Sequence, residues 1–341
     1  MARAKPKEIS LALQGGGAHG AFTWGVLDRL LEEDRLAIKA ITATSAGAMN
    51  AVALSAGMAA GGNQGARKSL ERFWRTVSDM GTPFSTTLWT QSPFAALPFS
   101  PFNAAMAFTS IASPYEFNPF DLNPLRDALD GAIDFELVSK APVQLFLSAT
   151  NVESGRVKVF TGEEVTRDSV LASACLPQTF RAVEIDGHAY WDGGYMGNPS
   201  LFPLIYADAP RDVLLVLLNP IGRTGVPRRV PEIQDRLNEI TFNASLIGEL
   251  RAIAFVQRLI DDGMLKETIM KKYRRLNIHA VRGGQILRDL SLQTKYDTGW
   301  HFLTNLRDKG RKEADRWLNE CATYIGTGKS AVDLRKEFLD S

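Results

Sequence analysis

Residues 8–33 read EISLALQGGGAHGAFTWGVLDRLLEE and decide the fold expected for this 341-residue chain. The first six residues form a short, mostly apolar run, as a buried β-strand does. The glycines of QGGGAHG, residues 14–20, then favour a tight turn. Apolar residues follow at the spacing of one helical face, namely Phe22, Val26, Leu27, Leu30 and Leu31. A strand, a glycine-rich loop and a helix in this order are typical of an α/β fold.

The next segments repeat this alternation. Residues 40–43 predict a second short strand, which leads into TSAGAMNAVALSAG at residues 44–57, a stretch of small residues that favours a helix. Further strands are expected at residues 143–149, 156–160, 213–218 and 276–281. Several of them are apolar on both faces, as buried parallel strands are. The sequence therefore predicts a three-layer α/β/α fold with a central, mostly parallel sheet.

We expect a catalytic α/β domain over residues 1–230 and a mainly helical C-terminal part over residues 231–341 that packs on it. Two apolar stripes predict core-facing helix faces in the second part: Leu246, Ile247, Leu250, Ile253 and Ala254, and then Ala314, Trp317, Leu318 and Cys321. Residues 80–115 contain no Asp, Glu, Lys or Arg but are rich in aromatic residues and proline. They fit either a buried insertion or a flap around an apolar site that also touches lipid.

Composition limits the classes of partner and compartment. A formal net charge of +1 argues against a nucleic-acid binder, and 45% hydrophobic with 23% charged residues is ordinary for a soluble globular protein. Two cysteines, Cys175 and Cys321, predict a reduced cytoplasmic protein rather than a disulfide scaffold. Neither a signal peptide nor a membrane-spanning run of ~18 apolar residues is expected. The oligomeric state is left open.

Contact with a membrane, if it occurs, is expected to be peripheral. The basic run MKKYRR contributes Lys271, Lys272, Arg274 and Arg275. Such a run fits a solvated helix end, or a site that attracts anionic lipid head groups.

The glycine-rich loop has two interpretations. Gly15, Gly17 and Gly20 satisfy the pattern G-x-G-x-x-G that binds dinucleotides. That pattern also needs an acidic residue at the end of the second strand, whereas the acidic residues 32–34 fall in the first helix or at its exit. No Gly-Lys-Ser/Thr follows either, so this is not a P-loop. A nucleotide-binding module stays as an alternative to a catalytic loop.

The second strand ends in Ala43-Thr44-Ser45-Ala46-Gly47, close to the G-x-S-x-G nucleophile elbow with alanine for the first glycine. A helix N-cap in a small-residue turn is the alternative interpretation. Because neighbouring strand ends share one crevice in an open α/β sheet, the peptide N–H groups of the glycine loop are expected to face the Ser45 hydroxyl. Donors preset in this way stabilise an oxyanion that forms during acyl transfer.

A nucleophilic serine needs a proton acceptor. His279 or His301 would fit the hydrolase order of serine, acid and histidine. However, neither lies in a glycine-bounded turn that would aim it at Ser45. Asp192, in AYWDGGYMGNP at residues 189–199, follows a strand-like stretch and precedes two glycines, as a residue exposed on a tight turn does. In a water-poor site such a carboxylate becomes basic enough to accept the proton. The alternative is that Asp192 only begins a turn.

These motifs resemble those of the patatin-like phospholipases, lipid acyl hydrolases with a Ser-Asp dyad. GGGAHG is similar to the family's G-G-G-x-R-G loop with His19 in place of arginine, ATSAG to its elbow, and DGG to its aspartate motif. The resemblance covers roughly residues 9–218, and the helical remainder is similar to an extension in bacterial members.

The resemblance implies that Ser45 is the nucleophile, Asp192 the general base, and the backbone N–H groups of the loop the oxyanion hole. The residues of that oxyanion hole are Gly15, Gly16, Gly17 and Ala18. The substrate would be a phospholipid or another acyl ester. It would be cleaved through an acyl-enzyme intermediate, without a metal or cofactor. A catalytically silent lipid-binding relative is the alternative. Head group, chain length and the position of the ester are not predicted.

Overall fold

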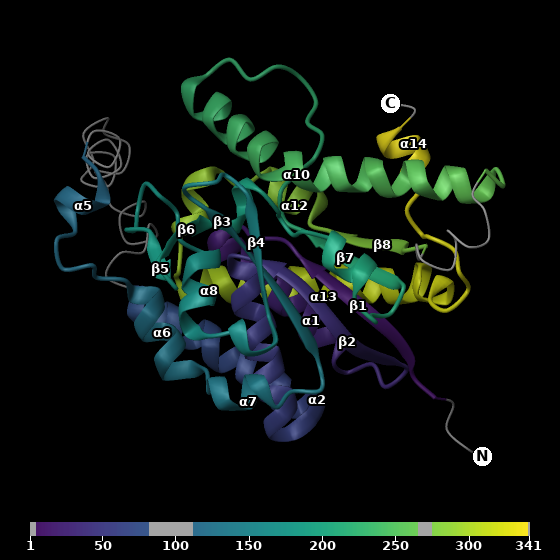
Figure 1. The fold of residues 1–341 in the computed structure, drawn as a ribbon, viewed down its shortest axis with the longest axis horizontal. Helices are drawn as coiled ribbons and strands as arrows, with labels where there is room; N and C mark the ends of the chain where they lie inside the picture. The colour runs from purple at the N-terminus through teal and green to yellow at the C-terminus, as the bar shows by residue number, and fades with distance from the viewer. Residues whose placement is uncertain (1–4, 82–111, 265–274, 340–341) are drawn as a thin grey trace.

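The computed structural model describes residues 5–81, 112–264 and 275–339. Within them one sheet of eight strands forms the centre of the molecule (Figure 1). The strands are β1 Lys7–Leu13, β2 Leu36–Thr44, β3 Gln144–Asn151, β4 Val157–Thr161, β5 Val183–Ile185, β6 His188–Asp192, β7 Asp212–Leu217 and β8 Asn277–Arg282. The strands β3, β2, β1, β7 and β8 run parallel to one another, while β4 and β6 pair antiparallel with β3, and β5 with β6.

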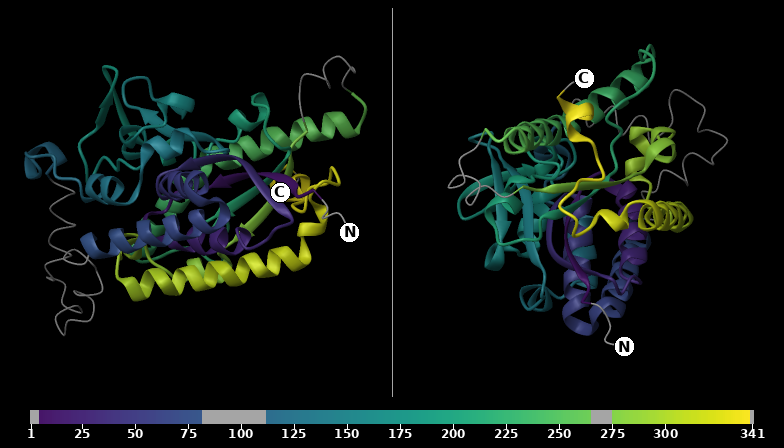
Figure 2. Two further views of the ribbon diagram at one scale, coloured as in Figure 1. Left: turned by 90° about the horizontal axis from the view of Figure 1, so that it is seen from below. Right: turned by 90° about the vertical axis from the view of Figure 1, so that its right-hand side faces the viewer.

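Helices cover both faces of this sheet. The α-helices are α1 Gly20–Leu30, α2 Ala46–Gly81, α5 Pro114–Phe117, α6 Pro124–Ala132, α7 Phe135–Ser139, α8 Arg167–Ser173, α9 Phe202–Tyr206, α10 Val230–Asp261, α12 Gly284–Arg288, α13 Trp300–Glu320 and α14 Leu334–Phe338. Short 3-10 turns lie at η1 Gly17–His19, η3 Gly162–Glu164, η4 Gly193–Tyr195, η5 Leu292–Tyr296 and η6 Ala322–Tyr324. Figure 2 shows α13 and α10 on opposite sides of the sheet.

Alternation along the parallel strands divides the core into two layers. In β7, Leu214 and Val216 join the cluster formed with α1, α2 and α13, whereas Val213 and Leu215 join the cluster formed with α9, α10 and α14. Successive side chains of a strand point to opposite faces, so a strand that is apolar throughout is covered on both sides. The predicted three-layer α/β/α fold with a mostly parallel sheet is confirmed.

The strand predictions hold with shifts of a residue or two at their ends, except that β2 begins at Leu36, four residues before the strand predicted at residues 40–43. The strand expected at residues 156–160 is β4, an antiparallel edge of β3 rather than a member of the parallel set. The strand expected at residues 276–281 is β8, which extends the same sheet beside β7, so the C-terminal part contributes to the central layer as well as helices. Both apolar stripes predicted there lie on helix faces that are largely buried.

Two predicted features fall mostly outside the described residues. Of the uncharged segment 80–115, residues 82–111 are not described. Of the basic run, only Arg275 is described, and it forms an ion pair with Asp261.

The pairing of β3 explains how distant segments meet. Ala149 and Thr150 pair with β4 and also with β6, so β4 and β6 must lie on opposite edges of β3. Residues 146–148 pair in the same way with β4 and β2. The strands β2 and β6 therefore share one edge of β3: β2 ends at Thr44 opposite Ser148, and Asp192, the last residue of β6, lies opposite Ala149.

Candidate active site

Ser45 occupies the turn between β2 and α2 in a strained backbone conformation. Its φ of 55° is left-handed, a region that non-glycine residues rarely adopt. The Ser45 N–H donates to Ser173 Oγ at 2.9 Å, and that hydroxyl donates to the Ser148 carbonyl at 2.7 Å. Ser173 thus ties the turn to β3 at Ser148. A serine held on a sharp strand-to-helix turn is the geometry expected of a nucleophile elbow.

The small residues of the elbow have different roles. A Cβ atom on Gly47 would lie 2.3 Å from the Leu13 carbonyl oxygen, so only glycine lets α2 begin this close to β1. Ala43, in contrast, is an ordinary strand residue of β2 whose methyl group is fully buried in the core. Alanine in place of the first elbow glycine is therefore compatible with the turn.

Asp192 places a buried carboxylate at the end of β6. The residue is 1% exposed and caps η4, with Oδ1 accepting the Gly194 N–H at 2.7 Å. Its backbone is fixed as well, because its N–H donates to the Cys175 carbonyl at 2.8 Å and its carbonyl accepts the Thr150 hydroxyl at 2.9 Å. Oδ2 has no hydrogen-bond partner within the described residues. One carboxylate oxygen is thus held, and the other is available.

The electrostatics of Asp192 suit proton transfer near neutral pH. Burial, the largest effect, raises the pKa of this carboxyl from 3.8 to about 6. The Gly194 N–H, the Ser45 hydroxyl and the charge of Lys295 act against that rise by lowering the pKa. Ser45 is thus close enough to influence the carboxylate, although the contact falls short of a well-formed hydrogen bond to Oδ2. Such contacts are often loose before substrate binds.

The glycine loop lies directly beside the elbow. A Cβ atom on Gly15 would be 2.7 Å from Ser45 Cβ. The Gly15 N–H already donates to Asn198 Oδ1 at 2.7 Å, so it is not available to an oxyanion. Gly16, Gly17 and Ala18 are at the start of the helical turn, where N–H groups lack an intrahelical acceptor, and no residue in the described part of the chain accepts from them. Three of the four predicted donors therefore have no acceptor among residues 5–81, 112–264 and 275–339.

His19 occupies the position of the arginine in the pattern G-G-G-x-R-G, and its side chain is neutral. Burial lowers its pKa to about 3, and the charge of Lys295 adds to that effect. Its Nε2 is 2.7 Å from the Thr294 hydroxyl, so the ring turns toward η5. The side chain of His19 supplies no positive charge to the loop.

The sequence motifs did not single out Lys295. Its Nζ donates to Asn219 Oδ1 at 2.8 Å and to Asn238 Oδ1 at 2.7 Å. Its carbonyl oxygen lies where a Cβ atom on Gly17 would approach to 2.5 Å. Lys295 belongs to a five-residue 3-10 turn with no recognisable pattern, so nothing in the sequence marked it.

Asn198 was also missed, although it lies in the quoted stretch AYWDGGYMGNP. The side chain is fully buried, accepts from Gly15 and donates through Nδ2 to the Phe242 carbonyl at 3.1 Å. Its position between a glycine and a proline was the available signal, because such residues fix turns.

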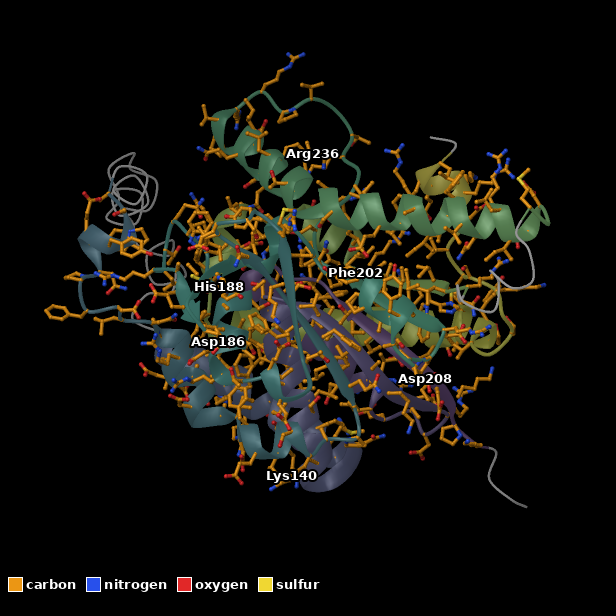
Figure 3. All side chains as sticks on the ribbon, in the orientation of Figure 1. Lys140, Asp186, His188, Phe202, Asp208 and Arg236 are labelled. Atoms are coloured by element: carbon orange, nitrogen blue, oxygen red, sulfur yellow. The ribbon has the colours of Figure 1, made fainter. Side chains whose placement is uncertain are left out.

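The histidines predicted as alternative bases serve elsewhere. His279 Nε2 is 3.0 Å from Asp212 Oδ1, deep between β7 and β8. His301 is exposed on α13, and His188 is exposed at the start of β6 near Glu153 (Figure 3). None of them hydrogen-bonds to Ser45 in the described part of the chain.

The nucleotide-binding alternative finds no second anchor. Glu32 pairs with Arg67 and Arg311 at the exit of α1, and Glu33 pairs with Arg35. These carboxylates lie away from the end of β2, where a ribose would be held. The arrangement favours a loop that receives a transient negative charge.

Cys175 and Cys321 are free thiols. In residues 5–81, 112–264 and 275–339 no three His, Cys, Asp or Glu side chains group as a metal site would, and none of the helices combines the length and hydropathy needed to cross a bilayer.

A family model described as "Patatin-like phospholipase" matches residues 11–208, more than half of the 341 residues. The chain therefore belongs to the patatin-like phospholipase family. Membership supports a hydrolase that acts on lipid esters. No curated protein matches the chain by sequence.

Solved structures similar to this chain include VipD from Legionella pneumophila, with 15% identity and a TM-score of 0.43 over 92% of this chain and 67% of that one. The heterodimeric ExoU–SpcU complex of Pseudomonas aeruginosa gives 13% identity and a TM-score of 0.39, covering 93% of this chain and 52% of that one. A structure of the type III effector protein ExoU gives 17% identity and a TM-score of 0.35, covering 93% of this chain and 54% of that one. The chain thus spans about half the length of the ExoU structures.

Proposed function

We propose that this protein is a serine lipid acyl hydrolase of the phospholipase A type, with Ser45 as nucleophile and Asp192 as general base. The observation that supports this proposal is that β2 and β6 each pair with the same edge of β3. The strained Ser45 follows the end of β2, and the buried Asp192 carboxylate ends β6 beside it. The N–H groups of Gly16, Gly17 and Ala18 would form the oxyanion hole.

In this mechanism the Ser45 hydroxyl attacks the ester carbonyl carbon while its proton passes to Asp192 Oδ2. The carbonyl oxygen becomes an oxyanion that accepts hydrogen bonds from the loop, each worth ~3 kcal/mol of transition-state stabilisation. Collapse breaks the ester C–O bond, and Asp192 returns the proton to the leaving alcohol. Water then attacks the acyl-enzyme and gives a proton to Asp192. As the bond between the acyl carbon and Ser45 Oγ breaks, Asp192 returns that proton to Oγ, and the acid leaves.

The hydrolase is tested by turnover of a medium-chain p-nitrophenyl ester and of a phospholipid. Ser45→Ala and Asp192→Asn should each lower kcat by about 10³-fold or more, because nucleophile and base act as one unit. The matched controls are Ser139→Ala, at the exposed C-terminal end of α7, and Asp186→Asn, on an exposed turn, and both should keep wild-type kcat. Retained turnover in either site variant would refute the Ser-Asp mechanism. A wild type that binds lipid without turnover would be a silent relative.

The outer face of α10 is proposed to contact an anionic lipid surface. The N-terminal half of this helix holds Asn238 and Phe242 toward the site. Its other side exposes an apolar stripe at helical spacing, formed by Val230, Ile233, Leu237 and Ile240, and Val226 is exposed in the segment before the helix. Exposed Arg228 and Arg229 lie beside the stripe, and Figure 3 marks Arg236 on the same half of the helix. Apolar residues flanked by arginine match a bilayer with negative head groups.

Sedimentation with phosphatidylcholine vesicles, with and without phosphatidylglycerol, tests this surface. The double variant Ile233→Ser/Leu237→Ser should lose binding to the anionic vesicles and keep turnover of the soluble ester. Unchanged vesicle binding would overturn the proposal. Loss of a dimer in size-exclusion chromatography, with vesicle binding intact, would assign the face to a second copy instead.

A further inference from the structure

A chain of hydrogen bonds joins Lys295 to the glycine loop. The Lys295 ammonium donates to Asn219 Oδ1 at 2.8 Å, and Asn219 Nδ2 donates to the Gly15 carbonyl at 3.0 Å. The Gly15 carbonyl belongs to the same peptide group as the Gly16 N–H. The chain therefore ends on a peptide whose N–H has no acceptor among the described residues and which follows directly on the contact between Gly15 and Ser45.

The direction of this chain matters for the strength of that donor. Withdrawal of electron density through a hydrogen-bonded carbonyl makes the N–H of the same peptide more positive, and successive hydrogen bonds polarise one another in a low-dielectric interior. A charged donor at the start strengthens the effect, since hydrogen bonds from an ionised group are stronger than neutral ones. The ammonium thus acts on Gly16 without touching it.

Asn219 is well placed to pass on the polarisation because it cannot rotate freely. Its N–H donates to Gln14 Oε1 at 2.8 Å, and its side chain is 3% exposed with both amide atoms bonded. The Gly15 peptide N–H is held from the other side by Asn198. Lys295 also packs its carbonyl against Gly17, which has a φ of +58°.

We propose that Lys295 is a positioning residue of the oxyanion hole, acting through Asn219 on the peptide between Gly15 and Gly16. This inference rests on the proposed acyl hydrolase. It assigns to a lysine from η5 the positive charge that neutral His19 does not bring to the loop.

The charge state of Lys295 gives the relay a pH signature. Burial lowers the pKa of its ammonium from 10.5 to about 8, while nearby carboxylates act in the opposite direction. The titratable and charged groups around it are Asp192, His19, Asp235 and Glu239, with Arg223 and Arg236 paired to Glu239. As Lys295 loses its proton above pH 8, the polarisation of Gly16 weakens and kcat declines.

Three variants separate this relay from a packing role. Lys295→Met removes the charge, Asn219→Asp removes the donor to Gly15, and Lys295→Arg keeps a charge that does not titrate below pH 12. We expect the first two to lower kcat by about 10- to 100-fold with KM unchanged, since weakening one oxyanion donor costs less than removing it. Lys312→Met, on the exposed side of α13, is the matched control and should match wild type.

The readouts are the pH profile of kcat and the affinity for an alkyl trifluoromethyl ketone, which forms an oxyanion adduct on a serine. Lys295→Arg should retain most of kcat and lose the decline near pH 8, and ketone affinity should fall in parallel with kcat in the other two variants. Combining Lys295→Met with Asn219→Asp should cost little more than either change alone. A Lys295→Met enzyme with normal kcat, or an alkaline decline that persists in Lys295→Arg, would overturn the relay.

Failure of the relay and failure of the hydrolase are distinguishable. Inactive Ser45→Ala with normal Lys295→Met rejects the relay alone. Active Ser45→Ala rejects the acyl hydrolase itself. If Lys295→Met fails to fold, Asn219→Asp and the pH profile of Lys295→Arg still decide the matter.

Discussion

Gly15 and Ser45 lie in direct contact: a Cβ atom on Gly15 would approach Ser45 Cβ to 2.7 Å. The same glycine is held through its N–H by Asn198 and through its carbonyl by Asn219. The loop and the elbow are thus fixed to each other, so any shift of one moves the proposed oxyanion donors relative to the proposed nucleophile.

Gly15→Ala should therefore impair catalysis more than folding. The added methyl group must displace Ser45 or the loop by a sizeable fraction of an ångström, and misplacement on this scale costs about 10²-fold in rate. We expect kcat of the p-nitrophenyl ester to fall by that order. Gly222→Ala, where an added Cβ meets nothing within 4 Å, is the matched control. Equal activity of the two variants would contradict this contact.

Asp192 should impose an acidic limit on activity. With a pKa of about 6, the carboxylate is protonated below that pH and cannot accept the serine proton. The expected profile of kcat/KM for a neutral ester rises about tenfold per pH unit up to pH 6 and then levels off. Initial rates from pH 4.5 to 7.5 measure it. A profile that is level down to pH 4.5 would count against Asp192 as the base.

Asn198→Ala should reduce both stability and turnover. The buried Gly15 N–H would lose its acceptor, at a cost of about 1–3 kcal/mol in the free energy of unfolding. The loop would also lose the contact that aims Gly16 and Gly17. Urea unfolding and ester turnover check the two effects. A variant as stable and active as wild type would show that Asn198 does not hold the glycine loop in its active position.

His19 should make stability depend on pH. Its pKa is about 3 in the folded protein against 6.5 in the unfolded chain, so the unfolded chain binds more protons between these values and stability falls as the pH is lowered. Asp192, with its raised pKa, acts with the opposite sign between pH 3.8 and about 6.

Comparison of wild type with His19→Gln at each pH isolates the histidine. Between pH 7 and 4.5 the free energy of unfolding of wild type should fall by about 2–3 kcal/mol relative to the variant. Chemical denaturation at the two pH values measures this difference. A constant difference between the proteins would show that His19 is not held neutral by burial.

Short-range patterns predicted most of the scaffold. The strand-loop-helix order around residues 8–33 and the apolar runs of β7 and β8 depend on local periodicity, which the sequence carries directly. The candidate serine and aspartate were also predictable, since tight turns demand glycine and small residues near Ser45 and Asp192.

The features that the sequence did not predict depend on pairing between distant segments of the chain. That β2 and β6 share an edge of β3 follows from strand register, which no local pattern records. The antiparallel pairing of β4 depends on it as well. Lys295 and Asn219 act through single hydrogen bonds between segments far apart in the chain, and lysine or asparagine in a turn is by itself ordinary.

The proposal that Ser45 is the nucleophile is tested most directly with an alkyl fluorophosphonate, which phosphonylates an activated serine. Peptide mass spectrometry then locates the adduct. We predict one adduct, on Ser45, absent from Ser45→Ala and formed at least 100-fold more slowly in Asp192→Asn. An unlabelled Ser45 in the active wild type, or labelling at an unchanged rate in Asp192→Asn, would contradict it.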